Sequence, residues 1–209
     1  MSATVAQAGD RQPLVDDRSW EQTRARFREV GARFQDAARH AYAERRFAAE
    51  LWQGAVEAGL LELVDGEPGP SLAALAAAME GLTQGSRDGG FLIVPITHCA
   101  LGMHVLREEA NREIRDHYLG RLATGKELLA FAITEPAGGT DAFRPNTTLS
   151  ADGGRLLLSG EKWHITSAPH AAMSIVWAAD PAYGDIAGVV VEHDWPGVEV
   201  SPPLRPAGT

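Results

Sequence analysis

The sequence predicts an α+β fold, in which an N-terminal all-helical domain precedes an antiparallel β-barrel or β-sandwich domain. Three observations support this prediction. Alanine, arginine, leucine and glutamate dominate residues 19–63, where apolar side chains recur every three or four positions. Beyond Lys126, short runs of β-branched and apolar residues alternate with turn signals. Charged residues also become less frequent beyond Gly125: residues 1–125 carry 18 acidic and 14 basic side chains, and residues 126–209 carry 10 and 5.

The helical domain is expected to span residues 19–125, after a mobile segment at residues 1–18. Its first helix should be capped by Asp17 or Ser19. The apolar stripe of this helix, which predicts a buried face, consists of Trp20, Thr23, Phe27, Val30, Phe34, Ala37, Ala38 and Ala41.

Four more helices follow in the prediction. A helix over residues 47–58 should end at Gly59, since glycine readily adopts the left-handed conformation of a C-cap. Residues 65–70 are rich in glycine and proline and predict a loop, after which Ser71 can cap a helix that extends to Leu82. The last two helices are expected over residues 91–106, with a bend at Pro95, and over residues 108–122.

The β-domain is expected to span residues 126–209 and to hold about six antiparallel strands with no helix among them. Asp152-Gly153-Gly154 predicts a tight hairpin turn, because glycine supplies positive φ angles without steric cost. The expected strand segments are residues 128–134, 146–150, 156–159, 163–167, 173–179, 186–192 and 198–201.

The composition excludes several classes of protein. A net charge of −9 argues against a general affinity for nucleic acid or for an anionic membrane. Cys99 is the only cysteine and the first eighteen residues resemble no signal peptide, so the sequence indicates a soluble cytoplasmic protein. The longest apolar stretch, residues 91–105, is too short to span a bilayer. Seventeen arginines against two lysines, with abundant alanine and glycine, are typical of a GC-rich bacterial genome.

Common catalytic motifs are missing, which argues against a nucleotide-binding P-loop, a serine hydrolase and a zinc protease. The histidines do not pair at metal-ligand spacing, so we expect no metal site. His98 and His104 are interpreted as ordinary core or surface histidines and Cys99 as a small core residue.

Two segments of the predicted β-domain carry chemistry. The first, residues 131–141, leaves a strand at Thr134-Glu135-Pro136 and enters a glycine-bearing loop that offers backbone N–H groups and hydroxyls to an anion or a carbonyl-rich ring. The second, residues 159–167, combines an aromatic ring, an imidazole and hydroxyls on one predicted strand. Each segment alone is weak evidence, but the pair is specific.

Together these segments resemble the acyl-CoA dehydrogenase family, in which a strand ends in Thr-Glu-Pro, a Gly-Ser-Asp loop and a hairpin follow, and a Gly-x-Lys-x-Trp-Ile-Thr strand completes the pattern. The stretch from Trp52 to Leu60 is similar to an early helix end of the family, and the stretch from Tyr118 to Gly125 to its approach to the first strand. The resemblance covers most of residues 45–209 in the family's order.

The resemblance implies FAD as the cofactor. By position, Phe131, Ile133 and Thr134 would line the flavin, with the Thr134 hydroxyl and nearby main chain on its pyrimidine side. Gly139 and Thr140 match the pair that approaches the flavin and its phosphates, and Thr140 is also a candidate substrate contact. Thr166 matches the threonine that faces flavin N5, which receives hydride.

The sequence departs from the family at two points. His164 stands where the family usually has tryptophan, and on a strand the neighbouring Trp163 would face the opposite side. The sequence also ends while the family's β-domain is still being completed, before the C-terminal helical domain that carries the family's catalytic glutamate. Glu135 is interpreted as a structural or loop-orienting carboxylate.

The resemblance therefore implies α,β-dehydrogenation of an acyl thioester, on CoA or on a carrier protein in lipid or secondary metabolism. The base would come from a second polypeptide that supplies the C-terminal helices, and electrons could pass to an electron-transfer flavoprotein. Two alternatives stay open: a non-catalytic scaffold subunit with the same fold, and a flavin monooxygenase-like relative that reacts with oxygen.

Overall fold

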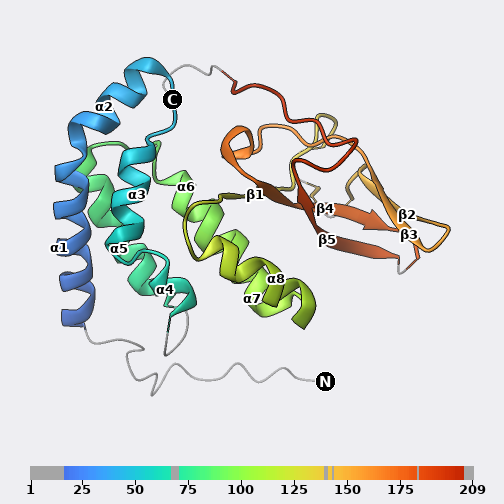
Figure 1. Cartoon of the computed structure of the whole chain (residues 1–209), viewed down its shortest axis with the longest axis horizontal. Helices are drawn as coiled ribbons and strands as arrows, with labels where there is room; N and C mark the ends of the chain where they lie inside the picture. Colours follow the sequence, from blue (N-terminus) through green and yellow to red (C-terminus); the bar gives the residue numbers. More distant parts are fainter. Residues whose placement is uncertain (1–16, 67–70, 139–140, 143, 183, 205–209) are drawn as a thin grey trace, which may run out of the picture.

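The computed structural model describes residues 17–66, 71–138, 141–142, 144–182 and 184–204. Helices form one end of the molecule and a sheet forms the other, with α6, α7 and α8 between them (Figure 1). The helical segments are α1 (Asp17–Arg33), α2 (Gln35–Glu44), α3 (Ala49–Glu57), α4 (Glu62–Asp65), α5 (Leu72–Ser86), α6 (Ile93–Pro95), the π-helix η1 (Ile96–Met103), α7 (His104–Glu109) and α8 (Arg112–Leu122). The strands are β1 (Leu129–Ala132), β2 (Thr148–Asp152), β3 (Arg155–Ser159), β4 (Met173–Asp180) and β5 (Asp185–Glu192), and a short 3-10 helix, η2 (Ala168–His170), precedes β4.

Local signals placed two helix ends correctly. The Ser71 hydroxyl accepts a hydrogen bond of 3.2 Å from the Ala74 N–H, as a cap of α5 should. Gly59, just beyond α3, has a φ of +84°. Both features depend on residues within one turn of the helix end, which is why the sequence alone predicted them.

Three helix predictions need correction. The first helix is broken at Phe34, whose φ and ψ of −101° and 13° separate α1 from α2. The last helix begins at Arg112 and not at residue 108, because the Asn111 side chain caps it by accepting from the Ile114 N–H. The helix that we expected to bend at Pro95 runs from α6 into a π-helix, since proline donates no backbone hydrogen bond and interrupts the α-helical ladder.

Helices α1 and α5 pack unusually closely through glycine. A Cβ atom on Gly81 would overlap the backbone oxygen of Arg24 and would lie 2.9 Å from the Arg28 nitrogen. Gly85 and Gly31 are in the same position relative to the facing helix backbone. The two helices therefore approach backbone to backbone, a contact that side chains would prevent.

The predicted α+β class is confirmed, but the sheet is open and mixed where we expected an antiparallel barrel or sandwich. β4 lies at its centre and pairs with β5 in antiparallel fashion along its whole length. The opposite edge of β4 is shared by β1, which runs parallel to it, and by β2, which meets it at Thr148 and Ala179. β1 can run parallel to β4 because the long intervening chain allows the return that a tight hairpin does not.

The β2–β3 hairpin forms at the predicted turn, where Gly153 and Gly154 have φ values of +56° and +83°. Two expected strands do not form. Residues 198–201 lie outside the sheet, and the segment from Trp163 to Ser167 is irregular, with a bend at His164 and a turn at Thr166 and Ser167. The φ values of His164 and Ser167, +56° and +64°, are incompatible with an extended strand.

The junction between the helices and the sheet is held by two buried rings. The Trp52 indole N–H donates to the Gly125 carbonyl at 2.8 Å, and the Leu129 N–H donates to Nδ1 of His98 at 3.0 Å. The two rings meet edge to face at 5.2 Å. They fix both ends of the connection between α8 and β1.

Within the described part of the chain, no helix is long and apolar enough to cross a membrane.

Acid should weaken this junction. Burial lowers the pKa of His98 from 6.5 to about 4. The unfolded chain therefore binds more protons between these values, and folding stability falls as the pH drops from about 6.5 to about 4, by about 3 kcal/mol in all. A His98→Asn variant cannot titrate here, although its amide oxygen can still accept from Leu129. We expect urea unfolding at pH 7 and pH 5 to differ less for this variant than for the wild type, and an equal difference would contradict the assignment.

Candidate functional site

The two chemistry-bearing segments meet in the folded chain. The Trp163 N–H donates to the Thr134 carbonyl at 2.8 Å, and the Lys162 ammonium donates to the Ile133 carbonyl at 3.0 Å. The end of β1 and the segment that follows β3 thus lie side by side, although about 30 residues separate them in sequence. The site is built where these two segments touch.

Glu135 is the anchor of this contact. Its carboxylate forms a 2.8 Å ion pair with Lys162, and the two side chains are only 5% and 8% exposed. It also accepts hydrogen bonds from the backbone N–H groups of Asn146 and Thr147, at 2.6 and 2.9 Å. The carboxylate therefore ties the Thr-Glu-Pro corner to both neighbouring segments, which confirms its interpretation as a structural, loop-orienting group.

The charge on Glu135 is stabilised although it is buried. Burial alone would raise the pKa of this carboxyl, but the hydrogen bonds from Lys162, Thr147 and Asn146 outweigh it and hold the pKa well below its usual range. Glu135 is therefore an anion in neutral and in mildly acidic solution. It is not a candidate proton acceptor.

Gly160 allows the second segment to approach this anchor. Its φ is +154°, and a Cβ atom there would lie 2.6 Å from Cα of Thr147. A side chain would push the segment off the start of β2. The glycine of the Gly-x-Lys pattern therefore has a steric role in placing Lys162.

The residues predicted to line a flavin lie along these segments. Phe131, in β1, is half-buried and its ring lies 5.9 Å from that of Trp177. Ile133 is half-buried, Thr134 is exposed and Thr166 is half-buried. Gly139 and Thr140 were also predicted here, and both lie outside the described residues.

His164 is exposed, and its ring lies 5.0 Å from the Trp163 ring. Since the segment is not a strand, the expectation that Trp163 and His164 face opposite sides does not hold. The left-handed backbone at His164 turns the chain so that the two rings lie against each other. Trp163 is itself 47% exposed, so both rings are accessible at the surface.

Unpaired polar groups test whether this site suits a polar, conjugated cofactor. The Ser167 hydroxyl, next to Thr166, is buried and has no hydrogen-bond partner among the described residues. The exposed Thr134 lies on the adjoining segment. Hydroxyls and main-chain groups from two joined segments suit a ring edge rich in nitrogen and carbonyl oxygen, as in a flavin. The residues present therefore fit FAD.

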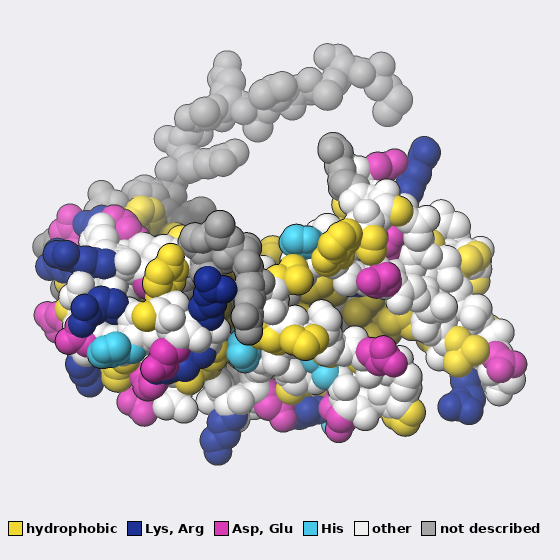
Figure 2. Space-filling model, turned by 90° about the horizontal axis from the view of Figure 1, so that it is seen from above, with side chains coloured by type: hydrophobic (Ala, Val, Ile, Leu, Met, Phe, Trp, Pro, Cys, Tyr) yellow, Lys and Arg dark blue, Asp and Glu magenta, His cyan; other side chains and the backbone are white. Residues whose placement is uncertain are grey.

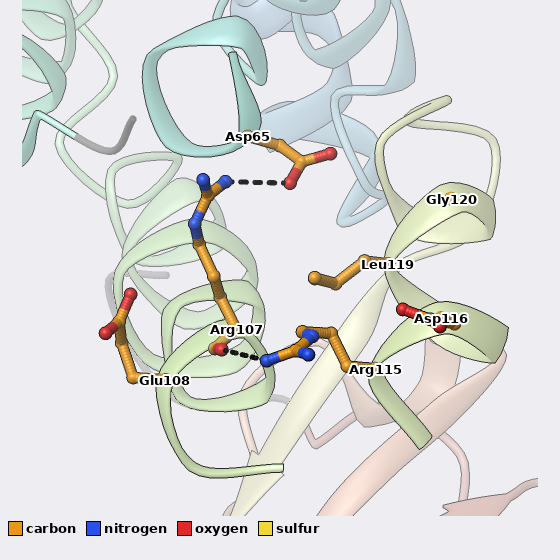
Figure 3. Close-up of a pocket in the computed structure, with 7 residues that line it drawn as sticks. All are labelled: Asp65, Arg107, Glu108, Arg115, Asp116, Leu119 and Gly120. Carbon is orange, nitrogen blue, oxygen red and sulfur yellow. Dashed lines mark hydrogen bonds and ion pairs between the residues drawn. The ribbon is translucent and has the colours of Figure 1, made fainter. Parts of the chain in front are cut away.

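The sequence did not predict the hollow shown in Figure 3. It has a volume of about 450 Å³ and is lined by residues of α4, α7 and α8: Asp65, Arg107, Glu108, Arg115, Asp116, Leu119 and Gly120. Arg107 pairs with Asp65 at 3.1 Å, and Arg115 donates to the Arg107 carbonyl. Its arginines are engaged by the protein itself, and the hollow contains none of the predicted flavin residues.

Among the described residues, no cluster of three or more His, Cys, Asp or Glu side chains could hold a metal ion.

Comparison with known proteins covers nearly the whole chain. Residues 18–126 match the family model of the acyl-CoA dehydrogenase N-terminal domain. Residues 130–209 match that of the acyl-CoA dehydrogenase middle domain.

Among curated proteins, an L-prolyl-[peptidyl-carrier protein] dehydrogenase from a Serratia species is 32% identical over 75% of this chain and 42% of its own length. Among solved structures, PigA with FAD and proline is 27% identical, with a TM-score of 0.78 over 89% of this chain and 51% of that one. A Mycobacterium smegmatis glutaryl-CoA dehydrogenase in complex with FADH2 is 26% identical, with a TM-score of 0.76 over 90% and 48%. The chain spans about half the length of these proteins or less.

Proposed function

This chain belongs to the acyl-CoA dehydrogenase family, and from that premise we propose that it forms two domains of an FAD-dependent enzyme that dehydrogenates an acyl thioester between its α and β carbons. The helical domain would comprise residues 19–125 and the flavin-binding domain residues 126–209. FAD is the cofactor with which solved relatives of this chain are described. The observation that carries the proposal is the contact between the Thr134 and Trp163 backbones. This contact joins residues 131–141 and residues 159–167, the two flavin motifs of the sequence.

The chain's own residues would bind and orient the flavin. Phe131 and Ile133 offer apolar surface, and the Thr134 hydroxyl offers a hydrogen bond to the pyrimidine edge. Gly139 and Thr140 would approach the phosphates, with Thr140 also near the substrate. The Thr166 hydroxyl would face N5, beside His164. When bound, the flavin supplies the acceptor for the hydride that leaves the β carbon.

The proton chemistry would belong to another polypeptide. We propose that a second chain supplies the C-terminal helices and the glutamate that removes the α proton. In support, hydrophobic side chains gather where the helices meet the sheet (Figure 2), and large apolar residues such as Ile93 and Leu101 are 47% and 39% exposed. A second helical polypeptide would cover such a surface. The thioester would be on CoA or on a carrier protein, and an electron-transfer flavoprotein would accept the electrons.

His164 favours one alternative, a non-catalytic scaffold subunit. This residue replaces the family's usual tryptophan and is exposed. A flavin that lies beside a small, solvated imidazole ring is less shielded than one beside an indole. The two functions differ in whether the chain holds FAD, which the purified protein can answer.

The test is FAD binding by the full chain, followed by a hydroxyl-deleting variant. We expect near-stoichiometric flavin absorbance in the purified wild type. Thr166→Val keeps the shape of the side chain but removes its hydroxyl. With the partner chain and an acyl thioester present, we expect flavin reduction roughly tenfold to a hundredfold slower, because a preset donor near N5 is lost.

Thr148→Val, on the exposed side of β2, is the matched control and should leave flavin reduction unchanged. A wild-type chain that remains colourless with excess FAD would support the scaffold and end the proposal of an enzyme.

A further inference from the structure

We propose that Lys162 is a positioning residue that turns the backbone N–H of Thr134 outward, as a preset donor for the pyrimidine edge of the flavin. This inference rests on the proposed function, and it assigns a role to a side chain that does not itself contact the cofactor. Three observations carry it: the two bonds of Lys162, the geometry of the peptide that it holds, and the anchoring of its partner carboxylate.

Lys162 holds one carbonyl in place. Its ammonium, on a side chain only 8% exposed, lies 3.0 Å from the Ile133 oxygen and 2.8 Å from Oε1 of Glu135. A charged donor makes a stronger and more directional bond to a carbonyl than a neutral one does. The Ile133 oxygen is therefore fixed toward the protein interior.

The same peptide group carries the Thr134 N–H. A trans peptide is planar, and its C=O and N–H bonds point in opposite directions. If the Ile133 oxygen points at the Lys162 ammonium, the Thr134 N–H must point away from Lys162, and Thr134 is itself an exposed residue. No described residue accepts a hydrogen bond from this N–H. The charge on Lys162 also polarises the peptide, which strengthens the N–H as a donor.

Glu135 holds the Lys162 ammonium in position and balances its charge. The backbone N–H groups of Asn146 and Thr147 hold the carboxylate, so the Lys162 side chain cannot follow the Ile133 carbonyl if the loop shifts. Because the ion pair of Lys162 and Glu135 is neutral as a whole, it provides a hydrogen-bond donor for the Ile133 carbonyl without adding net charge beside the flavin ring. The arrangement serves the orientation of one peptide plane.

The test separates positioning from folding. Lys162→Met alone leaves a buried, unpaired carboxylate, so the informative protein is the double variant Lys162→Met/Glu135→Gln, which has no buried charge. Lys126→Met is the control, because Lys126 is the chain's other lysine and is exposed. Urea unfolding, the Kd for FAD and the visible flavin band are measured for each.

We expect the double variant to regain much of the stability that Lys162→Met loses. Its FAD affinity should nevertheless be about tenfold weaker than that of the wild type, with a shifted flavin band, because the Thr134 peptide is no longer held. Wild-type affinity and an unchanged band in the double variant would overturn the inference.

A cofactor-independent measurement covers the case in which the wild type binds no FAD. The residual dipolar coupling of the Thr134 N–H reports the orientation of this peptide in the full chain. We expect it to change in the double variant and to stay unchanged in Lys126→Met. No FAD binding with a changed coupling would reject the proposed function while the peptide-positioning role stands, and an unchanged coupling would reject that role itself.

Discussion

Replacing Gly81 with alanine is expected to lower the free energy of unfolding by about 3 kcal/mol, although alanine is the better helix former. The added Cβ would overlap the Arg24 backbone oxygen and would lie 2.9 Å from the Arg28 nitrogen. Backbone atoms cannot rotate aside as a side chain can, so α1 and α5 must separate along their length. Overpacking of this kind exceeds the gain in helix propensity, which is at most about 1 kcal/mol.

Gly120, within α8, is the matched control. A Cβ atom there meets nothing within 4 Å. Gly120→Ala should therefore stabilise the chain by about 0.5–1 kcal/mol, the ordinary advantage of alanine over glycine in a helix. Urea unfolding of the two variants gives both values. Equal effects at the two positions would show that α1 and α5 are not in backbone contact.

Replacing Glu135 with leucine is expected to cost about 3–5 kcal/mol of folding stability, because it leaves the Lys162 ammonium buried without its counter-charge. It also removes the acceptor for the Asn146 and Thr147 N–H groups. Glu80→Leu is the control. Its pair with Arg24 is about half exposed, at 49% and 40%, and should contribute less than about 1 kcal/mol.

The effect of the Glu135 variant should depend on pH. Since the folded chain lowers the pKa of this carboxyl below its ordinary 4.5, its contribution is complete above that value and is lost as the pH falls. The difference in unfolding free energy between wild type and Glu135→Leu should therefore shrink below about pH 4.5. A difference that stays constant from pH 6 to pH 3 would show that Glu135 does not stabilise the chain as an anion.

The candidate site was predictable in its composition but not in its contacts. The sequence contained both flavin motifs in the family's order and indicated that Glu135 is structural. It did not show that Lys162 bridges Glu135 and the Ile133 carbonyl, because that contact joins residues 27 and 29 positions apart. It also misread the segment from Trp163 to Ser167 as a strand, since its apolar and β-branched residues suit a strand while the backbone at His164 does not.

By itself, the sequence determined the features that neighbouring residues control. These include the cap at Ser71, the left-handed end at Gly59, the hairpin at Gly153 and Gly154, and the division into a helical and a β-rich half. Each depends on the conformational preference of one residue or on a short periodicity, and both can be read along the chain.

Only the tertiary structure decided which edges of β4 are paired, why α5 needs glycine at position 81, and how the two flavin motifs are joined. Each of these depends on the approach of segments that are distant in sequence. Local propensity carries no information on such an approach, because its energy arises only when both segments are already in place.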